Sequence, residues 1–565
     1  MITPLEKQWE VAAPISPDID RGLQNFPPVL RQILFNRGYT TPETARQFLE
    51  AQPPEGTEPG NLSGFSAAAE RIWHAIHKHE PIAIYGDYDA DGVTATALLI
   101  QVFQMLGADV RPYIPNRFDE GYGLNFEALS TLHAEGVRLV ITVDCGIRSL
   151  AEADYAQQLG LDLIITDHHH PGDEIPSSLA IINPKLPDDT YPDKDLAGVG
   201  LAYKLADGLL QQAGKTDFSV ESLLDLVAIG TVADLAPLVG ENRALVRRGL
   251  RSIRRPSRQG IMSLIGVAGL TPTRITATDI GFTLGPRLNA AGRLDSALAA
   301  FHLLTTQDVQ EAARLAQELD NQNRERQKVT HQIQEQAQQM AQARAESDFL
   351  IFADDPSFNP GVVGLAASRL TELFYRPVIV AHHGEEFTVG SCRSIPEFHI
   401  TKALDECADL LEHHGGHAAA AGFTVRNENL PALVERLQAI ATTQLAELDL
   451  RPVLHADVEI PLSELKPELL THLDWLQPTG YGNRQAAFIS RGLRVTRQQA
   501  VGKDSSHLKL AVTDGRITYD AIAFRLGHWV GRMPAAIDLL YTFEKNEFNG
   551  RVSLQLNVRD LRPSD

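Results

Sequence analysis

Between residues 67 and about 240, short apolar runs alternate with stretches whose apolar residues recur at helical spacing. The apolar runs predict strands at residues 82–85, 110–114, 138–143, 161–166 and 179–182. The stretches between them predict helices at residues 67–78, 94–106, 125–135 and 150–159. Alternation of this kind is typical of a mainly parallel sheet with helices on both faces.

The pattern changes three times along the rest of the chain. Residues 298–345 are rich in Gln, Ala, Glu and Arg with almost no Gly or Pro, which predicts one long connecting helix. A second α/β unit is predicted from a strand at 348–353, a helix at 365–374 and a strand at 377–381.

Short alternating strands then predict a small β-barrel, with a tight turn at Asn549-Gly550. These strands are expected at residues 454–460, 487–489, 493–497, 508–512, 519–523, 537–543 and 552–558. A leader with a helical pair around residues 29–49 precedes all of this. The predicted division is a leader at 1–66, an α/β domain at 67–300, a connecting helix at 301–345, a second α/β domain at 346–450 and a barrel at 454–565.

Composition limits the possible classes of protein. A chain of 565 residues is too long for one core, and 43% hydrophobic with 22% charged residues is typical of a globular protein. We expect a cytoplasmic protein, because there is no apolar run of membrane length, no signal-peptide pattern, and only three scattered cysteines. The net charge of −21 argues against nucleic-acid binding for the chain as a whole, although a local basic surface can exist on an acidic protein.

Carboxylates follow the first apolar run at every second position, as Asp87, Asp89 and Asp91. Closely spaced carboxylates are typical ligands of hard divalent cations. The same string matches the opening of an EF-hand loop, but that loop requires a glutamate where Leu98 stands and a helix where a strand is predicted. A solvated acidic turn without a ligand remains an alternative.

Two further predicted strands end in candidate ligands. Asp144 follows the strand at 138–143, and Asp167, His168 and His169 follow the strand at 161–166. Ligands bind beyond the carboxyl ends of parallel strands, so these side chains are expected to meet at one edge of the sheet. Asp234, at the end of a predicted helix, is a last candidate, or simply an acid before a proline stop.

The candidate set contains oxygen and imidazole ligands and no thiolate, which favours Mn²⁺ or Mg²⁺ over zinc or copper. Four or five carboxylates carry enough charge for two ions. Two such ions suit an in-line displacement at phosphorus, so the residues alone predict a two-metal phosphoester hydrolase with a long phosphate-binding cleft.

Several segments are candidates for phosphate contacts. Seven arginines between residues 243 and 258 form either a solvated helix face or a phosphate-contacting surface. Small residues and forked donors mark GPRLNAAGR at 285–293, GSCRS at 390–394 and GGHAAAAG at 415–422, where the last could also be a tightly packed helix start. The predicted contact residues are Arg287, Asn289, Arg293, Ser391, Arg393, Gly415, Gly416 and His417.

Four motifs together resemble those of the DHH phosphoesterase superfamily: GDYDADG at 86–92, VDCG at 143–146, DHH at 167–169 and ADLAPL at 233–238. GPRLNAAGR resembles a segment of the RecJ branch, GSCRS and GGHAAAAG are similar to signatures of the DHH-associated domain, and PTGYGN at 478–483 in the barrel region is also RecJ-like. The likeness covers roughly residues 75–560.

The resemblance implies a DHH domain and a DHH-associated domain joined by a long helix, followed by an OB-like barrel. It implies a 5′→3′ exonuclease on single-stranded DNA, acting in recombination and repair with two Mn²⁺ or Mg²⁺ ions. A monomer without membrane contact is expected, with a helicase and a single-strand-binding protein as partners. The implied metal ligands are Asp89, Asp91, Asp144, His168 and Asp234, with Asp87 as a ligand or a supporting acceptor.

The resemblance also implies roles for the residues around the metal ligands. Asp167 is expected to orient an imidazole, and His169 to act on the scissile phosphate or the leaving oxygen. Arg287, Arg293, Arg393 and His417 are expected to grip phosphates near the 5′ end. The superfamily also contains oligoribonucleases, cyclic-dinucleotide phosphodiesterases and pyrophosphatases, and a replication-complex subunit that has lost metal ligands; here every motif acid and histidine is present.

Overall fold

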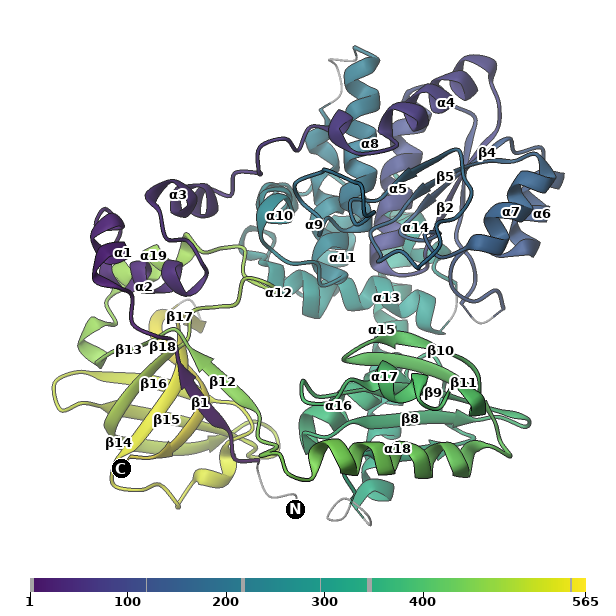
Figure 1. Cartoon of the computed structure of the whole chain (residues 1–565). Helices are drawn as coiled ribbons and strands as arrows, with labels where there is room; N and C mark the ends of the chain where they lie inside the picture. The colour runs from purple at the N-terminus through teal and green to yellow at the C-terminus, as the bar shows by residue number, and fades with distance from the viewer. Residues whose placement is uncertain are drawn as a thin grey trace. The chain divides into compact units, whose positions relative to one another are not determined.

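The structure is a computed structural model that describes residues 5–117, 119–214, 219–294, 296–342, 348–548 and 551–564. The chain divides into two compact units (Figure 1). One comprises Val11–Asp320 and His455–Asp565, and the other comprises Asn321–Leu454 with the N-terminal residues to Glu10. Within the described ranges, no helix combines the length and the apolar character needed to cross a membrane.

A five-stranded parallel sheet in the order β3-β2-β4-β5-β6 forms the first part of the larger unit. Its strands are β2 (Ile82–Gly86), β3 (Val110–Tyr113), β4 (Leu139–Val143), β5 (Asp162–Thr166) and β6 (Ala180–Ile182). Every residue of β2 and β4 is buried, which is why both appear in the sequence as unbroken apolar runs. The predicted α/β alternation is therefore present.

Helices cover both faces of this sheet, as its alternating side chains require. Ile82 and Ile84 of β2 pack in the core formed with α4, α5 and α8, whereas Ala83 and Tyr85 pack in the core formed with α6 and α7. The helices are α4 (Phe65–Lys78), α5 (Ala90–Met105), α6 (Phe126–Ala134), α7 (Leu150–Leu159) and α8 (Gly198–Gln212). Helix α5 begins four residues before the predicted start, because Asp89 caps it.

A helical region completes the first domain. Its helices are α9 (Leu224–Ala233), α10 (Gly240–Ile253), α11 (Gln259–Val267), α12 (Ala277–Asp279), the π-helical turn η4 (Ile280–Leu284), α13 (Gly285–Leu294) and α14 (Leu298–Thr305). The prediction of one helix from 298 to 345 was wrong, since α14 ends at Thr305 and α15 (Val309–Gln342) starts anew. The break occurs where Asp308 accepts hydrogen bonds from the amides of Gln310 and Glu311 and so caps α15.

The smaller unit contains a five-stranded sheet in the order β10-β11-β9-β8-β7. Its elements are β7 (Ile351–Asp355), α16 (Val363–Phe374), β8 (Val378–His383), β9 (Phe387–Arg393), α17 (Ile400–Asp405), β10 (Leu411–His417), β11 (Ala420–Arg426) and α18 (Leu430–Leu445). Gly415, Gly416 and His417 lie on β10, which pairs antiparallel with β11. The alternative of a helix start at these glycines was therefore wrong.

The C-terminal part of the larger unit is a closed barrel. Strands β14 (Phe488–Val501), β15 (His507–Thr513), β16 (Thr518–Ala523), β18 (Arg551–Pro563) and β17 (Ile537–Phe548) pair in that order, and β17 pairs back to β14. The two strands predicted at 487–489 and 493–497 are one strand with an irregularity between Ser490 and Leu493. The predicted turn at Asn549-Gly550 lies outside the described residues.

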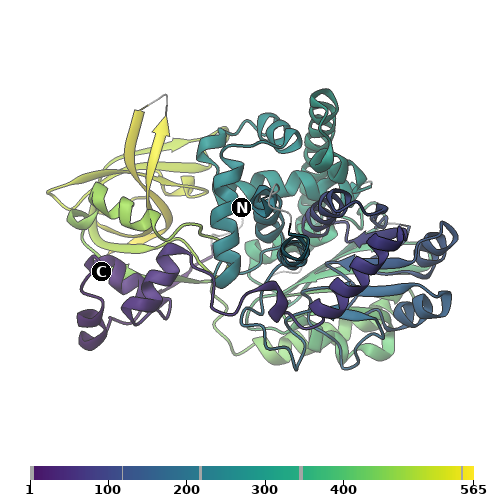
Figure 2. The same cartoon turned by 90° about the horizontal axis from the view of Figure 1, so that it is seen from above.

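The predicted leader shares a hydrophobic core with this barrel. Helices α1 (Pro17–Gly22), α2 (Pro28–Asn36), α3 (Pro42–Glu50) and α19 (Pro467–Asp474) lie beside the strands in both views (Figures 1 and 2). Two short strands, β1 (Gln8–Val11) and β12 (Val453–Ala456), form a ribbon, and β13 (Val458–Glu459) pairs with β14. The two ends of the sequence therefore contribute to one folded module.

Candidate metal centre

The carboxyl ends of β2, β4 and β5 bring three acids to one edge of the sheet. Gly86 is aligned with Val143, and Val143 with Thr166, so the next residues, Asp87, Asp144 and Asp167, start from the same level. Strand β3 lies on one side of β2, and β4 lies on the other. The order of the strands therefore reverses at β2, and ligands bind at such a topological switch point, beyond the carboxyl ends of the strands.

The first turn of α5 adds two further carboxylates. Asp89 is the N-cap, and its Oδ1 accepts hydrogen bonds from the amides of Asp91 and Gly92 at 2.8 and 3.1 Å. Asp91 is fully buried, and its two oxygens accept hydrogen bonds from the amides of Gly198 and Val199 at 2.7 and 2.9 Å. Both acids thus have one fixed orientation.

His168 lies at the middle of the cluster. Its Nε2 is 3.0 Å from Asp144 Oδ1, 3.7 Å from Asp234 Oδ2 and 4.0 Å from Asp91 Oδ2. Asp234 reaches this position from the C-terminal end of α9. One imidazole nitrogen is therefore surrounded by carboxylates from three separate segments.

Two buried atoms of this cluster are suited to ligate a cation. Asp144 Oδ1 and His168 Nε2 are buried and 3.0 Å apart, and among the described residues neither has a hydrogen-bond partner. Asp144 also has a left-handed backbone with φ of 64°, an unfavourable conformation for a residue other than glycine. Buried polar atoms normally have partners, and a divalent cation would satisfy both.

The electrostatics agree with this interpretation. Burial, reinforced by the charges of neighbouring aspartates, raises the pKa of Asp91 to about 7 and that of Asp234 to about 9. Burial and the same repulsion raise the pKa values of Asp87 and Asp144 well above their usual range. Burial lowers the pKa of His168 to about 3, so its imidazole is neutral and suited to metal ligation.

The ligand atoms fall into overlapping triads, each with atoms within 4.8 Å of one another. The triads are Asp91/His168/Asp234, Asp87/Asp89/Asp144 and Asp144/His168/His169. The first two share no residue, and all offer only oxygen and nitrogen. This ligand set fits hard divalent cations such as Mn²⁺ or Mg²⁺.

His169 is held by the remaining carboxylate. Its Nδ1 lies 2.8 Å from Asp167 Oδ1, while Asp167 Oδ2 accepts a hydrogen bond from the amide of Ile147 at 2.9 Å. Burial disfavours the imidazolium, but the hydrogen bond and charge of Asp167 outweigh it and raise the pKa of His169. The hydroxyl of Tyr122 is 3.4 Å from the same Nδ1, and half of this tyrosine is exposed. Asp167 thus fixes the ring that lies nearest the solvent side of the cluster.

Both alternatives for the first acidic motif were wrong. Asp87 and Asp91 are buried and Asp89 is partly buried, so the motif is not a solvated turn. The motif is preceded by strand β2 and not by a helix, which excludes an EF-hand.

The arginine-rich segment is mainly structural. Arg243 is buried and donates to five backbone carbonyls, and Arg258 pairs with the buried Asp225. Arg247 donates to the carbonyl of Leu49. For these residues, neither a solvated face nor a phosphate-contacting surface describes the structure.

The GPRLNAAGR segment lies on α13, next to the metal ligands. Asn289 Oδ1 accepts a hydrogen bond from the amide of Ala90 at 2.7 Å and so supports the first turn of α5. Arg287 forms an ion pair with the buried Asp320 at 2.9 Å. Burial raises the pKa of Tyr88 to about 12, and the positive charge of Arg293 opposes this rise. The structure therefore places Asn289 and Arg293 beside the acidic motif and holds Arg287 in an internal pair.

The other predicted phosphate contacts lie within the smaller unit. Ser391 and Arg393 are on β9, and Arg393 Nη1 lies 3.3 Å from Ser391 Oγ. β11 separates them from Gly415, Gly416 and His417 on β10, all three of which are exposed. A backbone glycine of α16, Gly364, approaches both Ser391 and Arg393 closely. Across β11, the strand register aligns Gly415 with Ser391 and His417 with Arg393.

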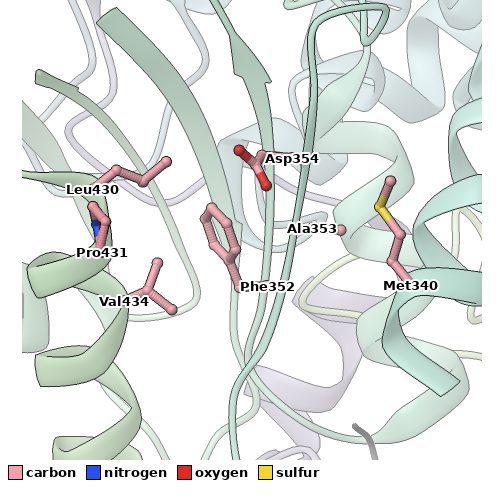
Figure 3. Close-up of a pocket in the computed structure, with 7 residues that line it drawn as sticks. All are labelled: Met340, Phe352, Ala353, Asp354, Leu430, Pro431 and Val434. Atoms are coloured by element: carbon pink, nitrogen blue, oxygen red, sulfur yellow. The ribbon is translucent and has the colours of Figure 1, made fainter. Parts of the chain in front are cut away.

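A cavity of about 500 Å³ in the same unit has a different character (Figure 3). Phe352 of β7 faces Leu430 and Val434 of α18, and Met340 lies on the other side of the strand. Its one carboxylate, Asp354, is paired with His383 Nδ1 at 2.8 Å. None of the predicted site residues lines this cavity.

Gly198, Val199 and Tyr122 belong to no motif that would mark them as functional from the sequence alone. The two amides that hold Asp91 are backbone groups, for which the only sequence signal is a glycine at a helix start. Tyr122 lies in a loop without a motif. Of the barrel aromatics, Tyr481 and Phe524 are exposed, and the side chain of Phe548 lies outside the described part of the chain.

Comparisons with known proteins match the whole chain. The DHH family N-terminal domain matches residues 81–231, the DHHA1 domain matches 347–443 and the RecJ OB domain matches 456–560. The single-stranded-DNA-specific exonuclease RecJ of Bacillus subtilis is 39% identical over 564 residues, which cover 99% of this chain and 71% of that protein. RecJ of Escherichia coli is 36% identical, with 95% of this chain and 96% of that protein covered.

Solved structures of RecJ also match this chain. The crystal structure of RecJ from Thermus thermophilus in complex with Mn²⁺ matches with a TM-score of 0.86 and 31% identity, covering 99% of this chain and 80% of that one. An exonuclease RecJ bound to manganese matches with a TM-score of 0.61 and 38% identity, over 69% of this chain and 98% of that one.

Proposed function

Because the chain belongs to the RecJ family of single-stranded-DNA-specific exonucleases, we propose that it is a metal-dependent exonuclease that removes nucleotides from single-stranded DNA in the 5′→3′ direction. The observation that carries this proposal is the buried Asp/His cluster at the sheet edge, in which Asp144 Oδ1 and His168 Nε2 have no hydrogen-bond partner among the described residues. Relatives crystallised with Mn²⁺ and with Mg²⁺ support the choice of ions.

Two ions would be held by the two triads that share no residue. One triad is Asp91, His168 and Asp234, and the other is Asp87, Asp89 and Asp144. Asp144 Oδ1 lies 3.0 Å from His168 Nε2, so Asp144 would stand close to the ligands of both triads. When bound, such ions polarise the scissile phosphate and lower the pKa of a water for in-line attack.

The chain's own groups supply the remaining chemistry. Asp167 holds Nδ1 of His169, which leaves Nε2 to interact with the scissile phosphate or to protonate the leaving oxygen. Asp87 completes the acidic cluster as a ligand or as a support for the neighbouring ligands.

Phosphate binding is assigned to both units. Asn289 and Arg293 are supplied by α13 beside the metal ligands. In the smaller unit, Ser391 and Arg393 are candidates for the 5′-terminal phosphate, and Gly415, Gly416 and His417 offer further donors on an exposed strand. A forked guanidinium is well suited to a terminal phosphate.

The closed barrel is assigned to the trailing part of the strand. Barrels of this kind bind single strands through exposed aromatic residues. Phe524, next to the end of β16, is a candidate, and Tyr481, in the turn before β14, is a second one. We further propose a cytoplasmic role in recombination and repair, with a helicase and a single-strand-binding protein as partners that supply and protect the strand.

The test compares digestion of single strands blocked at the 5′ or the 3′ end, with Mn²⁺, with Mg²⁺ or with a chelator. We expect digestion only from a free 5′ end and only with an ion. Preferential cleavage of a dinucleotide over a long strand would instead indicate an oligoribonuclease or a cyclic-dinucleotide phosphodiesterase.

Site variants complete the test. Asp144→Ala and His168→Ala are expected to lower turnover at least about a thousand-fold, or about 4 kcal/mol of barrier. The matched control is Asp188→Ala, an exposed aspartate, which should leave turnover unchanged. Near wild-type turnover of Asp144→Ala would overturn the assignment, whereas full activity of Asp234→Ala alone would remove only that ligand.

A further inference from the structure

Helix α8 begins against the acidic cluster and has no side-chain cap of its own. Its N-cap is Ala197, which cannot accept a hydrogen bond through its side chain. The amide of Gly198 donates to Asp91 Oδ2 at 2.7 Å, and that of Val199 donates to Asp91 Oδ1 at 2.9 Å. A carboxylate from the first turn of α5 thus caps a helix that starts more than one hundred residues later (Figure 1).

This contact fixes the orientation of Asp91. Both oxygens are held by adjacent amides of one rigid helical turn, so the carboxylate cannot rotate without losing a hydrogen bond. Asp91 Oδ2 also lies 4.0 Å from His168 Nε2. The lone pair of Oδ2 that does not accept from Gly198 is therefore available to the acidic cluster. The positive end of the α8 dipole also favours the charged form of Asp91.

The Cα of Gly198 also lies close to a second carboxylate, that of Asp144. A Cβ atom at this position would lie 2.7 Å from Asp144 Cβ and 3.0 Å from Asp144 Oδ1. Such distances are too short for carbon atoms, so Asp144 would have to move. Gly230 of α9 plays a similar part on the far side of Asp91, where a Cβ would lie 2.8 Å from Oδ1.

We propose that the first turn of α8 is a positioning clamp for the metal centre. Its amides hold Asp91, and the bare Cα of Gly198 sets the position of Asp144, so one turn of backbone fixes two ligands relative to each other. Gly198 and Val199 are positioning residues and do not touch the substrate. The effect on ion affinity rests on the proposed function, whereas the clamp itself exists without ions.

The first experiment measures Mn²⁺ binding to the full chain by electron paramagnetic resonance. Gly198→Ala should weaken Mn²⁺ binding about 10- to 100-fold, the range found when groups that support metal ligands are altered. Gly200→Ala is the matched control in the same helix, because the nearest neighbours of its Cβ would be side-chain atoms of Leu196, with Cδ2 at 3.2 Å, and not a candidate ligand. It should bind Mn²⁺ within about twofold of the wild type. Wild-type affinity in Gly198→Ala would overturn the positioning role.

The second experiment uses metal-free protein and does not depend on the proposed function. Asp91→Asn turns an NH₂ group towards one of the two amides, so hydrogen exchange in the first turn of α8 should accelerate about tenfold and the thermal midpoint should fall. Asp234→Asn removes a charge of the same cluster, but the amides of Gly198 and Val199 donate to Asp91 and not to Asp234, so exchange in α8 should stay unchanged. Equal exchange in both variants would overturn the clamp. Absence of Mn²⁺ binding in the wild type would refute the proposed function while leaving this second result interpretable.

Discussion

Replacing Arg243 by methionine is expected to destabilise the larger unit without weakening DNA binding. This guanidinium is 1% exposed and joins α10 to two other segments of that unit. It donates to the carbonyl of Phe48 at 2.8 Å and to those of residues 475–478 at 2.9 to 3.1 Å, and it lies 4.1 Å from the Phe48 ring centroid. Burial lowers the pKa of Arg243 to about 9, so it stays charged at neutral pH.

The expected loss follows from these contacts. Each hydrogen bond to a charged donor contributes about 1.5–3 kcal/mol, but the five act as one network and cannot be added. Methionine keeps the packing of the stem and leaves buried carbonyls without a donor, which corresponds to about 3–5 kcal/mol. The unfolding entropy of so large a unit makes 1 kcal/mol correspond to about 1 °C, so the thermal midpoint should fall by about 3–6 °C.

The assay is thermal unfolding, combined with hydrogen exchange in residues 42–50 and 475–478. Exchange should accelerate in both segments, and affinity for single-stranded DNA measured well below the midpoint should be unchanged. Arg243→Lys should lose at least half as much stability, because an ammonium cannot reproduce the planar fork. Arg251→Met, an exposed position on the same helix, is the control. A midpoint within about 1 °C of the wild type (about 1 kcal/mol) together with weaker DNA binding would show that Arg243 contacts phosphate instead.

Three further outcomes are expected. Removal of bound ions with a chelator should lower the thermal midpoint, and Mn²⁺ at about one hundred times its dissociation constant should restore about 2.7 kcal/mol, measured by calorimetry; no response would argue against a metal centre. Asp167→Asn should reduce turnover about 10- to 100-fold while Mn²⁺ affinity changes little, because Asp167 holds His169 Nδ1 at 2.8 Å; a pure loss of Mn²⁺ affinity would make Asp167 a ligand. Arg393→Gln should raise KM about 10- to 100-fold for strands with a 5′-phosphate and much less for strands with a 5′-hydroxyl, in steady-state assays on both; equal effects would place Arg393 elsewhere on the strand.

The sequence by itself determined the α/β alternation, the three strand ends that carry acids, the choice of hard cations and the C-terminal barrel. These features depend on local periodicity and on the identity of the residue after each strand. Apolar runs such as Ile82–Gly86 are buried on both faces, so the pattern of the sequence is directly the pattern of the fold. The resemblance of four separated motifs then linked these acids to one family.

The tertiary structure decided the features that depend on contacts between distant segments. Arg243 has the sequence context of a solvated basic face, yet its partners are carbonyls near residues 48 and 475–478. The helices at residues 17–50 share a core with a barrel that begins after residue 480. Gly415 and Gly416 have the local pattern of a helix start but lie on a strand, because pairing with β11 outweighs the local signal.

The metal centre itself shows both kinds of information. The residues proposed as its ligands could be named from the chain, because carboxylates and imidazoles that follow several parallel strands converge on one edge, where they favour a bound cation. Their support could not, since Asp91 is held by backbone amides of residues 198 and 199, and backbone groups are the same in nearly every amino acid. The type of each candidate ligand follows from its side chain, whereas its position depends on backbone contacts that exist only once the chain has folded.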